Sequence, residues 1–105
     1  MSLINNTKRW YDQNPTVSLA ISIFRNASRE NQKLVANFLL ENVFNNSKIK
    51  IHARKIPLFN RRWYDHDENV YMAVEFIRLS SANAQNQVAV EIINYLYALD
   101  SSINN

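Results

Sequence analysis

The sequence predicts an all-α protein formed by tandem duplication of a helical hairpin, which gives a four-helix domain with pseudo-twofold symmetry. Three observations support this fold class. Residues 9–43 align with residues 62–96 without a gap, apolar residues recur at helical spacing in both segments, and helix-capping residues precede each apolar run. Because 105 residues suffice for one core, we expect a single domain over residues 1–105, with a basic connection, residues 44–61, between the repeats.

The duplication becomes visible when the sequence is aligned with itself at an offset of 53 residues. Eleven of the 35 aligned positions are identical, and both tryptophans lie within a shared Arg-Trp-Tyr-Asp tetrad. Such self-similarity indicates that one supersecondary unit is repeated. The identical pairs are Arg9/Arg62, Trp10/Trp63, Tyr11/Tyr64, Asp12/Asp65, Val17/Val70, Ala20/Ala73, Arg25/Arg78, Ser28/Ser81, Gln32/Gln85, Val35/Val88 and Ala36/Ala89.

The first helix of each repeat is expected to begin after Asn14 or Asp67, since both are favourable N-cap residues. Pro15 follows in the first turn, where its missing N–H costs nothing. Apolar residues at i, i+3, i+4 and i+7 form a core-facing stripe, and further apolar residues predict burial on two sides. The stripes are positions 17, 20, 21 and 24 and positions 70, 73, 74 and 77, widened by Leu19, Ile23, Met72 and Phe76.

Ser28 and Ser81 are the expected N-caps of the second helices. The short connections before them predict that the two helices of each repeat are antiparallel neighbours. The core-facing positions are 35, 39 and 43 in one repeat and 88, 92 and 96 in the other. Because the chain contains no glycine, asparagine is expected to supply left-handed backbone where helices end, at Asn26, Asn45, Asn46 and Asn60.

The connection at residues 44–61 has two alternative interpretations. Residues 48–52 alternate in polarity like a strand, whereas positions 49, 52, 53 and 56 have helical spacing. A lone strand has no partner within an all-α domain. We therefore expect an extended arm or a short helix that ends before Pro57.

The missing residue types exclude several function classes. Without cysteine the chain has no disulfide, thiolate metal site or cysteine nucleophile, and without glycine it has no P-loop or dinucleotide-binding loop. No stretch approaches the roughly 20 apolar residues of a membrane span. The sequence thus predicts no cofactor, no membrane partner and a cytoplasmic location.

Residues 65–68, Asp-His-Asp-Glu, are a candidate metal-binding or catalytic cluster. A metal site needs three or more converging ligands, and the only other histidine is His52. Acidic residues at a helix start are also explained by the helix dipole. We therefore assign no catalytic or metal-binding residue and expect a non-enzymatic protein.

The two tetrads are candidates for partner binding, because aromatic faces and guanidinium groups could form a recognition pocket. A structural interpretation is sufficient to explain the identities, because duplicated units put the same residues in the same environment: Trp and Tyr pack over the hairpin, while Asp12 or Asp65 pairs with Arg25 or Arg78. The candidate residues are Arg9, Trp10, Tyr11, Arg62, Trp63 and Tyr64.

The connection is strongly basic. It and its flank carry six of the twelve cations, and no acid lies between Glu41 and Asp65. Such a patch attracts anionic partners, although a solvated linker has the same composition. The cations are Lys48, Lys50, Arg54, Lys55, Arg61 and Arg62.

Taken together, these features favour a helical interaction or assembly module whose surface combines the tetrads with the basic segment. A protein partner or self-association is expected. Binding of nucleic acid or another polyanion through residues 48–62 is the alternative.

Overall fold

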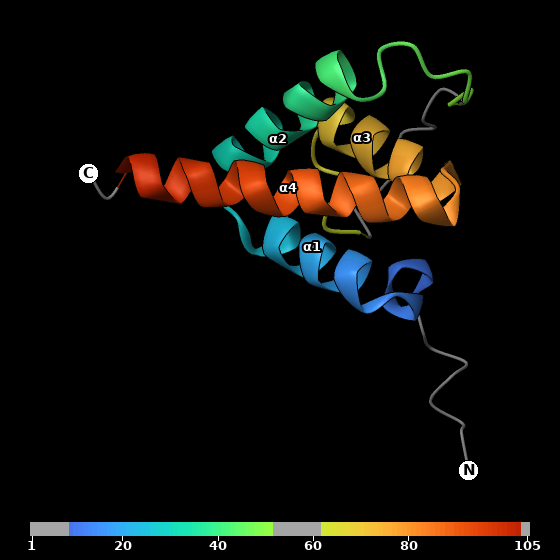
Figure 1. The fold of residues 1–105 in the computed structure, drawn as a ribbon. Coiled ribbons are helices and arrows are strands. Elements are labelled where there is room, and N and C mark those ends of the chain that lie inside the picture. The colour runs from blue at the N-terminus through green and yellow to red at the C-terminus, as the bar shows by residue number, and fades with distance from the viewer. Residues whose placement is uncertain (1–8, 52–61, 104–105) are drawn as a thin grey trace.

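The computed structural model describes residues 9–51 and 62–103, with the backbone alone for 101–103. The described secondary structure is entirely helical (Figure 1), which confirms the predicted all-α class. A 3₁₀ turn, η2, and four α-helices follow one another: η2 Trp10–Gln13, α1 Pro15–Asn26, α2 Arg29–Asn42, α3 Glu68–Leu79 and α4 Ala82–Ile103.

All four predicted N-caps are confirmed. Asn14 Oδ1 accepts hydrogen bonds from the backbone N–H groups of Thr16 and Val17, at 2.9 and 3.2 Å. These bonds satisfy donors that have no partner within the helix. Each of the other caps accepts one such bond: Asp67 from Val70, Ser28 from Asn31 and Ser81 from Ala84.

The expected left-handed helix ends are not found. No described residue has a positive φ, so the prediction is wrong for Asn26, Asn45 and Asn46. Asn60 lies outside the described residues. Instead, α1 and α3 end in extended backbone at Ala27 and Ser80.

A glutamine from the following helix donates hydrogen bonds to two carbonyls in the last turn of α1 and of α3. Gln32 Nε2 donates to the carbonyl oxygens of Phe24 and Arg25, at 3.2 and 3.0 Å. The equivalent Gln85 Nε2 donates to those of Ile77 and Arg78, at 3.0 and 3.3 Å. The identity of Gln32 and Gln85 therefore has a structural cause: in a chain without glycine, these amides close the helix ends.

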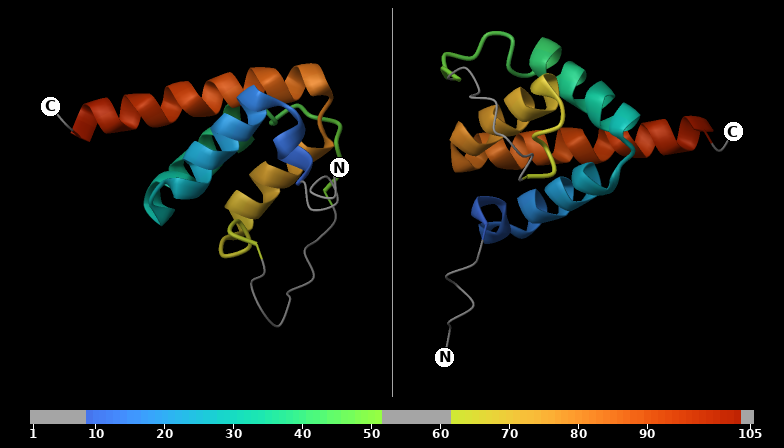
Figure 2. Two further views of the ribbon diagram at one scale, coloured as in Figure 1. Left: turned by 90° about the horizontal axis from the view of Figure 1, so that it is seen from below. Right: turned by 180° about the vertical axis from the view of Figure 1, so that it is seen from behind.

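The two helices of each repeat reverse direction at a two-residue connection and then diverge (Figures 1 and 2). Most contacts between helices are made across the repeats, by α1 with α4 and by α2 with α3. A pseudo-twofold axis that exchanges α1 with α3 and α2 with α4 also exchanges the α1–α4 pair with the α2–α3 pair. The apolar stripes of one repeat are thus buried mainly by the other repeat, with α4 lying across the molecule between α1 and the α2–α3 pair (Figure 1).

The core contains the predicted stripes except at Val43, which is only partly buried at the end of α2. All eight stripe residues of α1 and α3 are buried, as are Val35, Leu39, Val88, Ile92 and Leu96 of the second helices. The expectation that the first helices are buried on two sides is wrong at Leu19, whose exposed fraction is 54%.

The connection begins with a buried aromatic residue. Phe44 stacks on Phe76 of α3, with ring centroids 4.9 Å apart. Residues 47–51 then have no regular secondary structure, and residues 52–61 lie outside the described part of the chain. Both interpretations of that segment therefore stay predictions.

Candidate functional site

The two tetrads, 53 residues apart in sequence, lie together at one pocket. Its volume is about 490 Å³, and it is lined by residues 9–11, residues 62–64, Arg25 and Arg78. These residues bring four guanidinium groups and four aromatic rings to one place. We call this site the paired-tetrad pocket.

Each tetrad folds into a small self-contained clamp. Arg9 Nε lies 3.1 Å from Asp12 Oδ2, and the same carboxylate oxygen accepts a hydrogen bond from the backbone N–H of Arg9. The Arg9 guanidinium carbon lies 4.7 Å from the centroid of the Tyr11 ring. The clamp holds Arg9 between a carboxylate and an aromatic face, which is a favourable environment for a cation.

The second tetrad repeats this geometry with more hydrogen bonds. Arg62 Nε and Nη2 donate to the two carboxylate oxygens of Asp65, at 3.1 and 3.0 Å. Arg62 Nη1 also donates to the hydroxyl of Tyr64, and its guanidinium carbon lies 4.6 Å from that ring centroid. The similar clamps show that the tetrad identities have a local structural cause.

The expected pairing of Asp12 and Asp65 with Arg25 and Arg78 is wrong. Each aspartate is already held by the arginine three residues before it, which the 3₁₀ turn or tight turn brings close. Arg78 forms two hydrogen bonds with Glu75, at 2.9 and 3.0 Å. In the part of the chain that the structure describes, no carboxylate lies within ion-pair distance of Arg25.

The aromatic residues form the walls of the pocket and tie it to the core. The two rings of each tetrad meet edge to face, with centroids 5.2 Å apart in both repeats. Trp63 also meets Phe24 of the other repeat edge to face, again at 5.2 Å. Trp63 Nε1 is buried and has no hydrogen-bond partner among the described residues.

The electrostatics favour an anionic ligand. The hydrogen bond from Arg9 lowers the pKa of Asp12, so this carboxylate is ionised at neutral pH. Burial raises the pKa of Tyr64, which keeps its hydroxyl neutral and able to accept the hydrogen bond from Arg62. Three of the four arginines are paired with the carboxylates of Asp12, Asp65 and Glu75. The fourth, Arg25, leaves one positive charge in excess at the pocket.

The Asp65–Glu68 cluster consists of residues with separate structural roles. Asp65 pairs with Arg62, Asp67 caps α3, and His66 Nε2 lies 2.7 Å from Gln32 Oε1. Because the amide group of Gln32 donates to two carbonyls, its oxygen faces His66 and neutral His66 donates through Nε2. Within residues 9–51 and 62–103, no group of three or more acidic or histidine side chains is placed to hold a metal ion.

His66 makes the stability depend on pH. Burial, followed by the positive charges of Arg29 and Lys33, lowers its pKa in the folded state. The unfolded state then binds the proton more readily, so the free energy of unfolding should fall as the pH drops below about 6.5 and level off below the folded-state pKa. The variant His66→Gln introduces the residue that the first repeat has at the equivalent position, Gln13. It should lose the part of the pH dependence that comes from His66.

Urea unfolding between about pH 7.5 and pH 5 measures that effect, since most carboxylates titrate below this range. The wild type should lose more stability than the variant over the range. An equal loss in both proteins would assign the pH dependence to other groups.

The basic segment does not join the pocket as far as the structure describes it. Lys48 and Lys50 are exposed, and neither lines the paired-tetrad pocket. Arg54 and Lys55 lie outside the described residues. The structure therefore brings together the six tetrad residues of the predicted surface and places Lys48 and Lys50 elsewhere.

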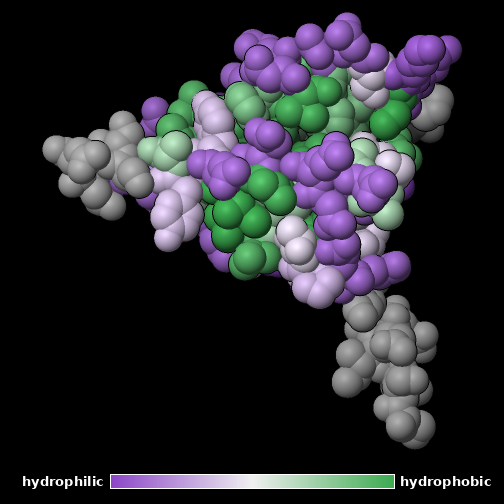
Figure 3. All heavy atoms as spheres, viewed as in Figure 1, coloured by the Kyte–Doolittle hydropathy of each residue, from purple (hydrophilic) through white to green (hydrophobic). Residues whose placement is uncertain are grey.

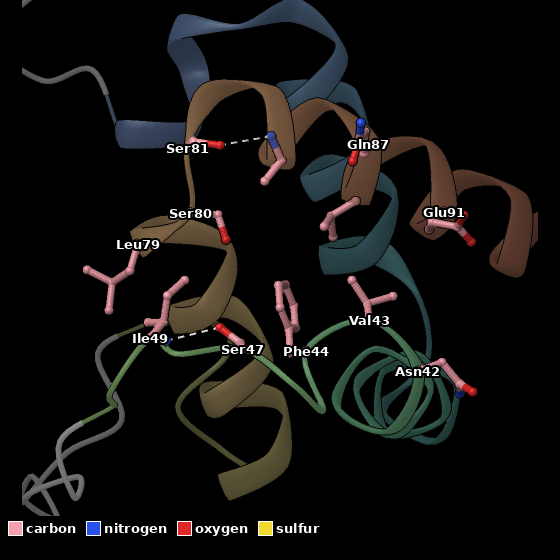
Figure 4. A pocket seen from close by; sticks show the side chains of 12 residues that line it. Asn42, Val43, Phe44, Ser47, Ile49, Leu79, Ser80, Ser81, Gln87 and Glu91 are labelled. Atoms are coloured by element: carbon pink, nitrogen blue, oxygen red, sulfur yellow. Dashed lines mark hydrogen bonds between the residues drawn. The ribbon is translucent and has the colours of Figure 1, made fainter.

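A larger hollow, of about 660 Å³, lies between the end of α2 and the α3–α4 connection. In Figure 4, Val43 and Phe44 lie across it from Leu79, Ser80 and Ser81. A hollow of about 400 Å³ has equivalent residues in the other repeat, including Ala27, Ser28 and Leu96. Each hollow lies where the turn between the two helices of one repeat faces the second helix of the other repeat. The described residues that line them include no cluster of cations.

Arg25 and Arg78 are the lining residues that were not assigned to the binding surface from sequence. The available signal was their identity at equivalent positions in the two repeats. Their role was missed because the tetrad aspartates were expected to neutralise them.

The rest of the surface is mixed in polarity. On the face shown in Figure 3, hydrophobic residues lie in separate patches that hydrophilic residues interrupt. None of the helices described here combines the length and the apolar character needed to cross a membrane. No protein-family model, curated protein or solved structure matches the chain significantly.

Proposed function

We propose that this chain is a non-enzymatic binding module that docks an acidic segment of a partner protein in the paired-tetrad pocket. The observation that carries the proposal is the meeting of both tetrads with Arg25 and Arg78 at one pocket of about 490 Å³. Three of the four guanidinium groups are paired with carboxylates of the chain, and Arg25 leaves one positive charge for a ligand.

The residue types match those that dominate protein–protein recognition. Arginine, tryptophan and tyrosine are enriched among the interface residues that contribute most binding energy. The planar guanidinium group can donate two parallel hydrogen bonds to one carboxylate. An acidic segment that also contains aromatic residues can use both the cations and the partly exposed rings of Trp10 and Trp63.

The size and charge of the pocket restrict the partner. A volume of about 490 Å³ is within the range typical of small ligand pockets and accommodates a few side chains. A second copy of the chain is a poorer partner, because its net charge is +3 and three of its carboxylates are already paired with arginines that line this pocket. We therefore favour a different, acidic protein, met in the cytoplasm.

A labelled peptide of alternating Glu and Tyr tests this proposal by fluorescence anisotropy, with the Gln-Tyr peptide as the uncharged control. The wild type should bind the Glu peptide and bind the Gln peptide at least about tenfold more weakly, since a charge-assisted pair contributes about 1.5–3 kcal/mol. Arg9→Gln and Trp10→Ala should each weaken binding. The double variant Lys48→Gln and Lys50→Gln is the matched control and should bind normally.

The same assay separates the alternatives. If the basic segment binds nucleic acid, single-stranded DNA should bind with a steep salt dependence, and neutralising Lys48, Lys50, Arg54 and Lys55 should remove most of its slope. Self-association should appear as a concentration-dependent mass in sedimentation. Equal binding of the Glu and Gln peptides, or loss of binding only in the lysine variant, would contradict the proposal.

A further inference from the structure

The two repeats differ at two positions beside the pocket. Tyr71 and Glu75 of α3 are replaced in α1 by Ser18 and Ser22. Because α1 and α3 have the same length and begin at positions 53 residues apart, these positions are equivalent in the two helices. The second repeat therefore shows what occupies the space that the two serines leave in the first.

In the second repeat, a ring and a carboxylate occupy this space. The ring of Tyr71 stacks on Tyr64 at 6.5 Å and lies 5.8 Å from the Arg62 guanidinium carbon. Glu75 is buried and forms two hydrogen bonds with Arg78. The arginine at the end of α3 thus has its own carboxylate, supplied by the same helix.

In the first repeat, the equivalent space is a hollow of about 220 Å³. Ser18 and Ser22 line it, and Arg9, Tyr11 and Arg25 border both this hollow and the paired-tetrad pocket. Asp12 also lies in the hollow, where Arg9 pairs with it and the Ser18 hydroxyl donates to it at 3.4 Å. Among the described residues that line the hollow, the remaining charge is that of Arg25.

We propose that this hollow binds a carboxylate and a neighbouring aromatic ring of the acidic partner, which take the places that Glu75 and Tyr71 take in the second repeat. The carboxylate pairs with Arg25, and the ring lies against Tyr11 beneath Arg9. This inference rests on the proposed function and adds a prediction: the pseudo-twofold pocket is asymmetric, and recognition of the charged group belongs to the first repeat.

The duplication supplies the test. Ser22→Glu places on α1 the carboxylate that α3 already has, so Arg25 gains an internal partner at the i, i+3 spacing. This variant should bind the Glu-Tyr peptide at least about tenfold more weakly, as expected when a charge-assisted pair is replaced. Ser22→Gln has nearly the same size without the charge and should bind much more tightly than Ser22→Glu. Neither variant should have a lower unfolding midpoint.

A small probe locates the site independently. 4-Hydroxyphenylacetate carries a phenol ring and a carboxylate, and its amide is the neutral control. In NMR titrations, the acid should shift the amide signals of residues 18–26 more than those of residues 71–79, and the neutral amide should shift both weakly. The variant Glu75→Ser should extend the shifts to the residues around Arg78.

The outcomes distinguish the two proposals. Normal binding of the peptide to Ser22→Glu, or equal shifts in both repeats of the wild type, would overturn this inference and leave the proposed function intact. Absence of Glu-peptide binding to the wild type overturns the proposed function itself. Phenyl phosphate in place of the acid shows whether the hollow prefers a phosphate, and tighter phosphate binding would overturn the assignment of a carboxylate.

Discussion

Phe24→Ala is expected to lower the free energy of unfolding by about 3–5 kcal/mol, the usual cost of removing a buried phenylalanine side chain. Phe24 has an exposed fraction of 0% and is among the largest fully buried side chains of the core. It also meets the Trp63 ring of the other repeat edge to face. The loss is a large part of the stability of a small domain, and urea unfolding measures it.

Leu19→Ala is the matched control for that variant. Leu19 lies on the same helix, but more than half of its surface is exposed. Its replacement should change the free energy of unfolding by roughly 0.5 kcal/mol or less, as for other surface positions. Similar losses in the two variants would contradict the assigned faces of α1. Because Trp63 borders the pocket, Phe24→Ala should also weaken binding of the Glu-Tyr peptide.

The separated halves of the chain, residues 1–51 and 62–105, are each expected to lack a cooperative unfolding transition. α1 packs mainly on α4, and α2 packs mainly on α3, so each half exposes the apolar stripes that the other half buries. Isolated helices of about 12–15 residues are marginal in water without such packing. Circular dichroism of each half during thermal unfolding measures the prediction.

Mixing the two halves is the control for that experiment. An equimolar mixture should regain helical signal and a cooperative transition, because the interface between the repeats is most of the core. If residues 1–51 alone unfold cooperatively, the hairpin is an independent unit and the packing across repeats is not needed for folding.

Local sequence patterns determined the secondary structure. Asn14, Asp67, Ser28 and Ser81 predicted the four helix starts, since a side-chain cap satisfies backbone donors only a few residues away. The period of the apolar residues predicted the buried stripes, because helical geometry fixes which side chains share a face. The repeated sequence predicted that the two tetrads have equivalent environments. It did not predict the pairs Arg9–Asp12 and Arg62–Asp65, because the aspartates were expected to pair with Arg25 and Arg78.

The candidate site could be predicted only in part. The six residues at positions 9–11 and 62–64 were identified from the tetrads, and the pocket contains all of them. Arg25 and Arg78 were missed as lining residues. Whether Arg78 pairs with Glu75 or with Asp65 depends on distances of a few ångströms, which sequence spacing alone does not decide.

The amino-acid sequence by itself determined the helices, their N-caps, their apolar faces and the correspondence between the two repeats, because each of these follows from local patterns along the chain. Only the tertiary structure decided that each repeat buries its stripes against the other, that two distant tetrads meet at one pocket, and that Arg25 faces no carboxylate there. An apolar stripe specifies that a face is buried but not which face covers it, since hydrophobic burial is not directional.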